Sequence, residues 1–513
     1  MTPLSSAFIE SLKDLQGVDG EKLIAALDTP PAVSIRKNRR KPVADPLFPE
    51  MTKVGVGWCA DGVYLPQRPI FTLDPLLHAG AYYVQDASSM IYQQIAERLT
   101  ERLTGSHHAD SGNEEKQKYD GQAGRHLTVL DFCAAPGGKT TAMINGFPDG
   151  TVIVSNEFVA SRGKILRENL EKWGYPGVIT TGAASSQYAG LPEMFDIVAV
   201  DAPCSGEGMM RKDEEARRQW SQELVEKCAL LQQEILSDLV GSIKPGGFLI
   251  YSTCTFNTEE DEHNSRYIAE RLGMIPVGME SLGLTGIEDA SPALENGIEG
   301  LRFMPHLTRG EGLYVSIFRK PGNYDDGLEL PDSDNLKYAS TRFSKKKNRN
   351  LGEKQHNGKK ERGCIELSPA NRNELKSLIR SDIDPQFELS GSMVTMLPAY
   401  ALPTLEILRS HGINVTGAGL PVAEIKGRAP RHEVIPDSRL ALNIAMRKEA
   451  LPSADLNAED TLRYLRGELT NLDENIPRGY VVVTYKGIPL GMMKNLGNRA
   501  NNIYPKAWRI RIS

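Results

Sequence analysis

The chain has 513 residues, of which 40% are hydrophobic and 25% are charged, and this composition excludes a collagen, a coiled coil and a chain that is disordered throughout. The net charge of -6 is divided unevenly, because residues 1–320 carry 31 basic and 43 acidic side chains whereas residues 321–513 carry 29 and 23. An acidic first part joined to a basic second part indicates either an enzyme with a nucleic-acid-binding appendage or a chance imbalance.

The sequence also lacks the features of membrane and secreted proteins. No window contains 18 uncharged apolar residues, and the N-terminus has neither the basic nor the apolar region of a secretory signal. The six cysteines are too few and too scattered for a disulfide framework, and no CxxC pair suggests a metal site. We therefore expect a cytoplasmic protein that contacts no membrane and holds no metal.

The N-terminal region, residues 1–75, begins with a short amphipathic helix that is predicted over residues 8–28. A dense basic cluster follows this helix and consists of Arg36, Lys37, Arg39, Arg40 and Lys41. Such a cluster is usually a solvated face, whereas in an enzyme that acts on RNA it is a strip that contacts phosphates.

Residues 76–320 alternate short apolar runs with amphipathic segments. The apolar runs are HLTVLDFC, TVIVSNE, FDIVAVDAP, GGFLIYSTC and GLYVSIFRK, and their near-continuous hydrophobicity is typical of strands buried on both faces. Segments 161–173 and 221–243 have helical spacing. The pattern predicts an α/β fold with a mostly parallel, doubly wound sheet. A polar stretch at about 104–125 has no periodicity and is predicted to be a flexible insertion.

Residues 321–385 are a predicted linker with the basic run SKKKNRN in its middle, and residues 386–513 form a second globular region. From Asn475 to the C-terminus this region contains seven Lys or Arg and no Asp or Glu. Four aromatic residues are interleaved with these charges. They either stack on unpaired bases or belong to the core of small strands, and they are Tyr480, Tyr485, Tyr504 and Trp508.

The strongest local signal is LDFCAAPGGKTT, residues 130–141. A strand ends at Asp131, a tight turn with two glycines follows, and a helix is predicted to begin. Such glycines let the backbone approach a ligand at the N-terminus of the helix. The run GGKT resembles the end of a phosphate-binding P-loop, but that motif requires a glycine where Cys133 stands, which argues against an ATPase.

Three further predicted strands end in acidic or nucleophilic side chains. Glu157 ends TVIVSNE, and an acidic side chain at that place can hold ribose hydroxyls. Another strand delivers Asp201 and Cys204, and the next delivers Cys254. Because ligands of open α/β sheets bind at the carboxyl ends of the strands, we expect these side chains to meet at one edge. A lone cysteine after a strand is usually a packing residue, whereas two at the same edge indicate chemistry.

The stretches DFCAAPGGKT, NEFVASRGKIL, DAPCSGEG and YSTCTFNTEEDE resemble those of the Sun/Fmu-type RNA (cytosine-5) methyltransferases, which use S-adenosylmethionine. Within that group the chain is most similar to the RsmF-type enzymes of bacterial 16S rRNA. The resemblance is specific over residues 76–320 and weaker towards both ends of the chain. It implies a Rossmann-like class I methyltransferase domain between an N-terminal RNA-binding segment (1–75) and a C-terminal α+β, PUA-like RNA-binding module (386–513).

The resemblance also implies roles for single residues. Glu157 holds the ribose of the cofactor, Asp201 lies against the target base beside the cofactor, and Cys254 is the nucleophile. The methionine part of S-adenosylmethionine is wrapped by a loop that consists of Cys133, Ala134, Ala135, Pro136, Gly137, Gly138 and Lys139.

The chemistry of cytosine explains why two cysteines are needed. Carbon 5 is a poor nucleophile until the Cys254 thiolate adds to carbon 6 and pushes electrons onto it. Asp201 is the natural partner for the N3 side of the ring, and Cys204 is suited to assist the loss of the carbon-5 proton that releases the enzyme. Lys139 either positions Cys254 or the base, or contacts the cofactor within its loop.

One residue departs from the family pattern, because Ala184 stands where an Asp near the adenine ring is usual. Either a neighbour such as Ser185 or a backbone amide replaces it, or the cofactor binds more weakly. We expect a monomer that acts on 16S rRNA or the small ribosomal subunit. The alternatives are a tRNA or 23S rRNA enzyme, a DNA enzyme with Cys204 as its nucleophile, and a non-catalytic ribosome-assembly factor that binds RNA.

Overall fold

A computed structural model describes residues 2–105, 126–323 and 367–511, apart from residues 14, 16, 296, 429 and 430. Residues 106–125 of the predicted insertion and the basic middle of the predicted linker lie outside the described residues, and so does Cys364, whereas Thr104 ends a helix. None of the helices in the described ranges combines the length and the apolar content that crossing a membrane requires.

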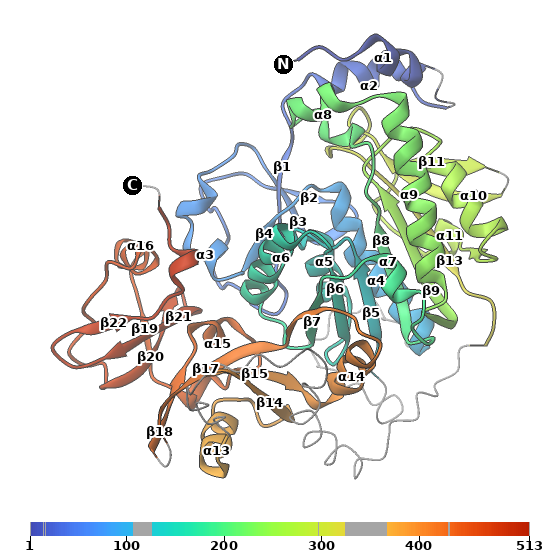
Figure 1. Cartoon of the computed structure of the whole chain (residues 1–513). Helices are drawn as coiled ribbons and strands as arrows, with labels where there is room; N and C mark the ends of the chain where they lie inside the picture. Colours follow the sequence, from blue (N-terminus) through green and yellow to red (C-terminus); the bar gives the residue numbers. More distant parts are fainter. Residues whose placement is uncertain are drawn as a thin grey trace, which may run out of the picture.

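The centre of the molecule is a ten-stranded sheet (Figure 1). Its strands are β5 (Thr128–Phe132), β6 (Val152–Asn156), β7 (Val178–Thr181), β8 (Phe195–Asp201), β9 (Ile243–Thr253), β10 (Ile275–Pro276), β11 (Ser291–Glu295), β12 (Ile298–Phe303), β13 (Leu313–Arg319) and β16 (Val415–Ala418). Strands β7, β6, β5, β8 and β9 are neighbours in this order and run parallel, and β13 pairs antiparallel with β9. The predicted mostly parallel, doubly wound sheet is confirmed.

Helices cover both faces of this sheet, which explains the near-continuous hydrophobicity of its strands. Val129 packs with Ile95 and Met143 on one face, whereas the next residue, Leu130, belongs to the cluster on the other face with Leu236. The helices of the first face are α4 (Ile91–Thr104), α5 (Gly138–Gly146), α6 (Ala160–Trp173) and α11 (Met279–Leu282). Those of the second face are α7 (Ser185–Tyr188), α9 (Gln222–Val240), α10 (Glu262–Glu270) and α14 (Leu402–Ser410).

The N-terminal part consists of two helices and a small sheet. The single helix predicted over residues 8–28 is wrong, because Gly17 adopts a φ of 74° and Asp19 caps a second helix through the backbone N–H of Lys22. These helices are α1 (Ser6–Lys13) and α2 (Gly20–Leu27). The sheet has the order β2-β3-β1-β4, with β1 (Val33–Lys37), β2 (Val54–Val56), β3 (Cys59–Leu65) and β4 (Tyr82–Val84), and helix α3 (Pro75–His78) precedes β4.

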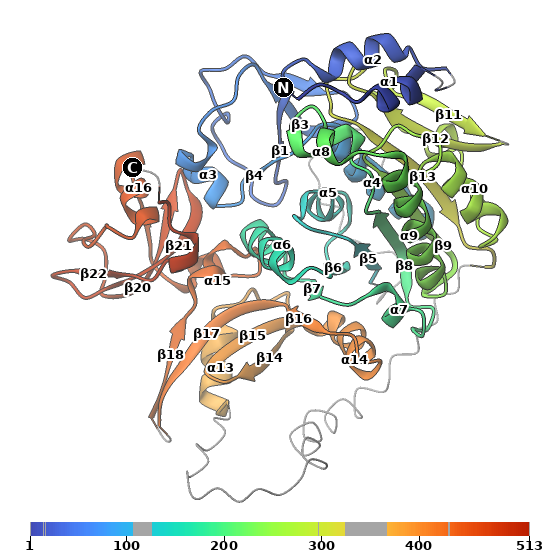
Figure 2. The ribbon, with the colours of Figure 1, turned by 45° about the horizontal axis from the view of Figure 1, so that its top comes forward.

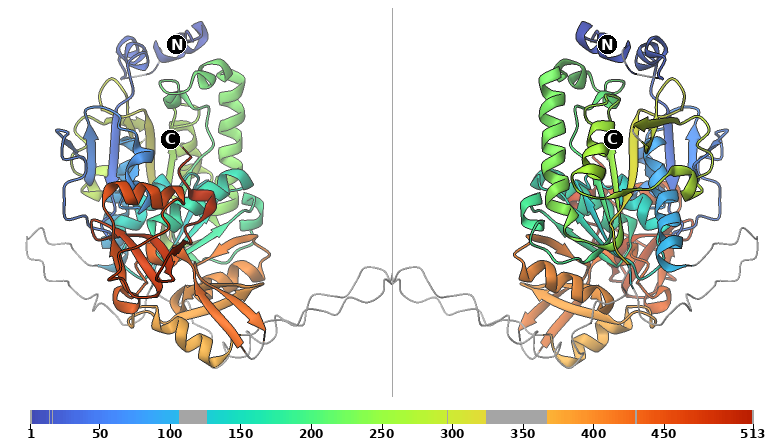
Figure 3. Two further views of the ribbon diagram at one scale, coloured as in Figure 1. Left: turned by 90° about the vertical axis from the view of Figure 1, so that its left-hand side faces the viewer. Right: turned by 90° about the vertical axis from the view of Figure 1, so that its right-hand side faces the viewer.

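The C-terminal part contains two four-stranded sheets (Figure 2). The first consists of β14 (Pro385–Ser390), β15 (Met393–Pro398), β17 (Leu420–Arg428) and β18 (Arg431–Pro436). The second consists of β19 (Ser453–Asp455), β20 (Gly479–Tyr485), β21 (Ile488–Asn495) and β22 (Ala500–Asn502). Their helices are α13 (Pro369–Ser377), α15 (Ser438–Leu442) and α16 (Ala458–Arg466). Figure 3 shows α1 and α2 at one end of the molecule and the first of these sheets at the other.

The C-terminal part packs against both the central sheet and the N-terminal sheet. Helix α13 lies inside the stretch predicted to be linker and packs its Leu375 into the core of the first C-terminal sheet. Strand β16 pairs antiparallel with β7 and so extends the central sheet. The second C-terminal sheet shares a core with the N-terminal sheet, in which Tyr82 and Trp508 are both buried. The C-terminal part thus covers the open edge of β7, and the apolar faces of the N-terminal sheet and the second C-terminal sheet cover each other.

The basic cluster, which begins at Arg36 on β1 and continues just beyond that strand, turns largely inward, so most of it is neither a solvated face nor a phosphate-contacting strip. Arg36 is fully buried and Lys41 is nearly so. Arg40 donates hydrogen bonds to the carbonyl oxygens of Ile144 and Phe147, at the C-terminal end of α5. Free carbonyl groups at helix ends require donors, and these side chains supply them.

Candidate active site

The two cysteines meet just beyond the carboxyl ends of β8 and β9. These strands are parallel neighbours in which Asp201 pairs in register with Ser252, so the residues that follow emerge side by side. The sulfur atoms of Cys204 and Cys254 lie 3.1 Å apart, and each side chain is partly exposed. The contact with Cys254, followed by burial, raises the pKa of Cys204. The Cys204 thiol therefore holds its proton more tightly than an ordinary cysteine, and either sulfur can donate the hydrogen bond between them.

Asp201 and Lys139 form an ion pair beside the cysteines, with 2.8 Å between Lys139 Nζ and Asp201 Oδ2. The other oxygen of Asp201 accepts a hydrogen bond from Ser252 Oγ at 2.9 Å, and Tyr92 OH lies 2.7 Å from the same hydroxyl. Burial alone lowers the pKa of Lys139, but the ion pair and hydrogen bond with Asp201, together with Cys254 and Asp131, outweigh burial and the net shift is upward. Lys139 is therefore a charged group that links the glycine loop to the strand carrying Asp201.

The glycine loop between β5 and α5 forms the tight turn that its sequence predicts, and one non-glycine residue in it also adopts a positive φ. Cys133 has a φ of 65° and Gly137 a φ of 108°, and no side chain caps the N-terminus of α5. The carbonyl oxygens of the loop are held from outside. Ala135 accepts from Arg162, and Pro136 accepts from Asn169 at 2.8 Å. The first amides of α5 have no partners within their helix and are available to a ligand.

Two acidic side chains at the ends of β5 and β6 contain buried oxygen atoms that accept no hydrogen bond within the described ranges. They are Asp131 Oδ1 and Glu157 Oε2. Burial raises the pKa of Asp131 to about 7, while its other oxygen accepts from Thr140. The second oxygen of Glu157 accepts from the backbone N–H of Val159 at 2.9 Å. Arg162 Nη1 forms an ion pair with Glu157 Oε2 at 3.5 Å without a hydrogen bond, whereas Asp131 Oδ1 has no hydrogen-bond partner in the described ranges. Buried acceptors without hydrogen bonds are costly, and these two point to a ligand that carries donors.

Two carboxylates that the sequence did not single out connect the cysteine loops. Glu207 lies after Cys204 in the chain, and its Oε2 accepts from the backbone N–H groups of Phe256 at 2.7 Å and Asn257 at 3.1 Å. Glu260 lies after Cys254, and its Oε2 accepts from the backbone N–H of Ser205 at 3.0 Å. Burial raises the pKa of both carboxyls. Both residues stand inside the motifs DAPCSGEG and TEEDE, which were the only sequence signal for them.

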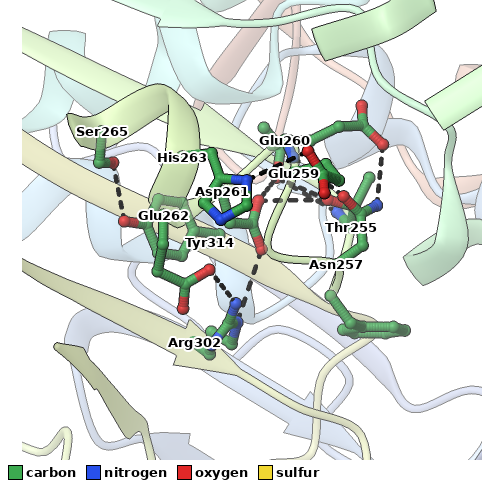
Figure 4. Close-up of polar contacts among 12 residues, drawn as sticks. Thr255, Asn257, Glu259, Glu260, Asp261, Glu262, His263, Ser265, Arg302 and Tyr314 are labelled. Carbon is green, nitrogen blue, oxygen red and sulfur yellow. Dashed lines mark hydrogen bonds and ion pairs between the residues drawn. The ribbon is translucent and has the colours of Figure 1, made fainter. Parts of the chain in front are cut away.

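Figure 4 shows a polar network that includes Thr255, Asp261 and Arg302, all of which are buried. Thr253 and Thr255 flank Cys254, and both hydroxyl groups donate to Asp261 Oδ1, at 2.5 and 3.2 Å. Arg302 Nε lies 3.5 Å from the other oxygen of Asp261. Burial raises the pKa of Asp261 well above its usual value. The network therefore fixes the backbone on both sides of Cys254.

The other residues that the sequence singled out lie in different environments in the structure. Tyr504 and Trp508 are buried in the core shared with the N-terminal sheet, so neither is available for stacking on bases. Tyr480 is half-buried, and the ammonium group of Lys494 lies 4.9 Å from its ring centre. Ala184 precedes α7 after the end of β7, and the neighbouring Ser185 hydroxyl donates to Asp238 at 2.6 Å.

Three family models match the chain. One described as 16S rRNA methyltransferase RsmB/F matches residues 122–319, one described as the N-terminal domain of 16S rRNA methyltransferase RsmF matches residues 4–87, and one described as the methyltransferase RsmF PUA domain matches residues 452–510. Together they cover the N-terminal part, the second C-terminal sheet and every strand of the central sheet except β16.

Curated relatives match most of the chain. Ribosomal RNA small subunit methyltransferase F of Aliivibrio fischeri (strain MJ11) is 30% identical over 459 residues, which cover 88% of this chain and 84% of the relative. The protein of the same name from Cronobacter sakazakii is 27% identical over 528 residues, covering 98% and 96%. A solved structure, "Crystal Structure of PH0851", has a TM-score of 0.50 at 21% identity and covers 62% of this chain and 66% of that chain, which supports the fold.

Proposed function

This chain belongs to the RsmB/F family of 16S rRNA methyltransferases, and we propose that it methylates carbon 5 of a cytidine through a covalent bond between Cys254 and carbon 6. The family establishes an rRNA methyltransferase with an RNA-binding PUA domain. The observation that carries the finer proposal is the 3.1 Å contact between Cys204 and Cys254 at the end of two parallel strands. Such a pair supplies one nucleophile and one proton-transfer group to the same ring.

The residues at the strand ends fit S-adenosylmethionine, which supplies an electrophilic methyl group when it is bound. Hydroxyl and ammonium donors would satisfy the buried oxygens of Glu157 and Asp131, and ribose and methionine carry such donors. We assign the ribose to Glu157 and the methionine part to the loop of residues 133–139. The open amides at the start of α5 suit a carboxylate.

The nucleophilic step uses Cys254. Its thiolate forms a bond to carbon 6, and the electrons of the carbon 5–carbon 6 double bond move onto carbon 5, which then accepts the methyl group. Asp201 faces the N3 side of the ring in this proposal, and Lys139 keeps its carboxylate oriented through their 2.8 Å ion pair. Lys139 then acts as a positioning residue rather than as a contact of the cofactor alone.

Release of the product uses Cys204. The hydrogen bond with Cys254 is the largest cause of the raised pKa of Cys204, and a carbon–sulfur bond at Cys254 turns that sulfur into a neutral thioether, which interacts with the Cys204 thiol more weakly. Cys204 then loses its proton to solvent more readily. Its thiolate takes the proton from carbon 5, the carbon 5–carbon 6 double bond reforms, and the bond to Cys254 breaks.

The names of the relatives suggest small-subunit ribosomal RNA as the substrate, which the family description gives as 16S rRNA, and we propose the cytoplasm as the place of action. Bisulfite mapping of ribosomal and transfer RNA from a deletion strain tests this assignment. Loss of one 5-methylcytosine from 16S rRNA is the expected result, whereas a loss confined to tRNA or 23S rRNA would reassign the substrate.

A trapping experiment tests the chemistry. RNA that contains 5-fluorocytidine is incubated with the protein and S-adenosylmethionine, because fluorine at carbon 5 cannot leave as a proton and the adduct persists. We expect a covalent complex with the wild type and none with Cys254→Ala. A complex that persists in Cys254→Ala and disappears in Cys204→Ala would move the nucleophile to Cys204, as in DNA enzymes.

A further inference from the structure

Arg36 is a fully buried cation on β1 of the N-terminal sheet. Its guanidinium group donates to four oxygens and lies 4.8 Å from the centre of the Trp173 ring. Nε donates to the side chain of Gln85 at 2.8 Å. The other three hydrogen bonds reach the first turn of α5, at the carbonyl oxygens of Gly138 (3.2 Å) and Thr141 (3.1 Å) and at Thr141 Oγ1 (2.7 Å).

Burying this cation costs free energy in two ways. No carboxylate of the described ranges lies within ion-pairing distance of Arg36, and burial lowers its pKa to about 10. A buried charge without a counter-ion is rare in proteins. In addition, a cation at the N-terminal end of a helix opposes the helix dipole. Folding alone gives little reason to keep an arginine at this place.

Two neighbouring basic residues bind helix ends at which a positive charge is favourable, unlike Arg36. Arg40 reaches the carbonyl oxygens of Ile144 and Phe147 at the opposite end of the same helix, where a cation is favourable. Lys41 likewise donates to the carbonyl oxygen of Lys172 at the end of α6. These two residues cap helix ends, whereas Arg36 holds the turn that follows the glycine loop.

We propose that Arg36 positions the cofactor loop, so that the N-terminal sheet serves binding of S-adenosylmethionine as well as any contact with RNA. The turn that it holds contains the open amides of α5 and Lys139, whose ammonium group reaches Asp201. Its charge adds to the positive potential at this helix end, which attracts a carboxylate. This inference rests on the proposed function, since it assumes that the loop holds S-adenosylmethionine.

The test measures the affinity of the full chain for S-adenosylhomocysteine by calorimetry. Arg36→Met keeps much of the volume but removes the charge and the donors, and we expect its Kd to rise about tenfold or more. Arg36→Lys retains the charge and should recover part of the affinity. Arg40→Met is the matched control, because it weakens the same helix at its other end, and its Kd should stay within about twofold. The affinity for RNA should stay unchanged in all three variants.

The outcomes distinguish this inference from the proposed function. A wild-type protein that binds no S-adenosylhomocysteine would refute the proposed function itself. A wild-type Kd retained in Arg36→Met, or an equal loss in Arg40→Met, would overturn only the role of Arg36. A loss of RNA affinity without a loss of cofactor affinity would overturn it too. If Arg36→Met does not fold, Arg36→Lys against Arg40→Lys gives the same comparison.

Discussion

Glu207 and Glu260 each accept hydrogen bonds from the backbone of the loop that carries the other residue. Glu207 lies on the Cys204 loop and binds the backbone after Cys254, whereas Glu260 lies after Cys254 and binds the backbone next to Cys204. The side chain of Asn257 donates to both carboxylates, at 3.0 and 2.9 Å. The two sulfur atoms are therefore held at their distance by reciprocal hydrogen bonds as well as by the pairing of β8 with β9.

Glu260→Gln should slow formation of the covalent adduct about tenfold, because a buried amide cannot accept all the donors that now face the carboxylate. Single-turnover trapping of 5-fluorocytidine RNA measures the rate. The matched control is Glu259→Gln, which changes the neighbouring residue on the exposed side, where it faces His263. Equal rates in the two variants would show that the reciprocal hydrogen bonds have no part in the reaction.

Cys204→Ala should form the adduct with ordinary RNA and fail to release it. The alanine removes the proposed acceptor of the carbon-5 proton but leaves Cys254 and the cofactor loop intact. Denaturing electrophoresis should therefore show a protein–RNA complex that accumulates with time and depends on S-adenosylmethionine. A variant that turns over normally would assign proton removal to another group.

Asp131 should make the free protein less stable as the pH rises. Its pKa is about 7 in the folded state against an ordinary 3.8, so the folded state binds the proton more tightly and stability falls between these two values. Between about pH 5 and about pH 8 the wild type should lose roughly 2–3 kcal/mol relative to Asp131→Asn. Urea unfolding at both pH values measures this difference. Asp149→Asn, an exposed change, should follow the wild type.

The end of the second C-terminal sheet should contribute to RNA binding. Arg478 and Arg499 lie at the ends of β20 and β22, one residue beyond the paired row of Gly479, Asn495 and Ala500, and both are exposed. Changing both arginines to glutamine should weaken RNA binding and reduce its salt dependence by a slope of roughly 1 to 2. Lys227→Gln on α9 is the control, and an equal effect of both changes would refute a specific surface.

Removing residues 386–513 is not a clean test of this surface. The truncation takes β16 from the central sheet and uncovers the core that Trp508 shares with Tyr82. A loss of cofactor binding after truncation would then reflect damage to the fold. Substitution of the exposed arginines leaves these contacts in place, so it tests the surface without disturbing the fold.

Ala184→Asp should stabilise the chain and bind S-adenosylhomocysteine more tightly. Position 184 has the extended backbone of a helix N-cap before α7, with φ -70° and ψ 156°, and an aspartate there stabilises by about 1 kcal/mol. An acidic group at this edge also offers an acceptor to the adenine amino group. Thermal unfolding and calorimetry measure the two effects separately. A gain in stability without a gain in affinity would show that Ser185 or a backbone group already fills this role.

The sequence by itself determined the central sheet and the residues at its edge. Buried parallel strands are short runs of almost continuously apolar residues, so their ends can be located in the sequence. Asp201, Cys204 and Cys254 lie at or just after such ends, and the sequence alone therefore assigned them to one edge of the sheet. The glycine loop was predictable from local sequence as well, because a turn with a positive φ at Gly137 favours glycine at that position.

The tertiary structure alone decided which side chains face inward and which loops bind each other. Arg36 reads as a surface cation among other cations, yet it lies 102 residues from Gly138 in the chain and donates to it. From the sequence, Trp508 could either stack on bases or belong to a core, and the N-terminal sheet covers it. The hydrogen bonds of Glu207 and Glu260 likewise join segments about fifty residues apart. Such contacts depend on which surfaces pack together after folding, and local periodicity or spacing does not predict that packing.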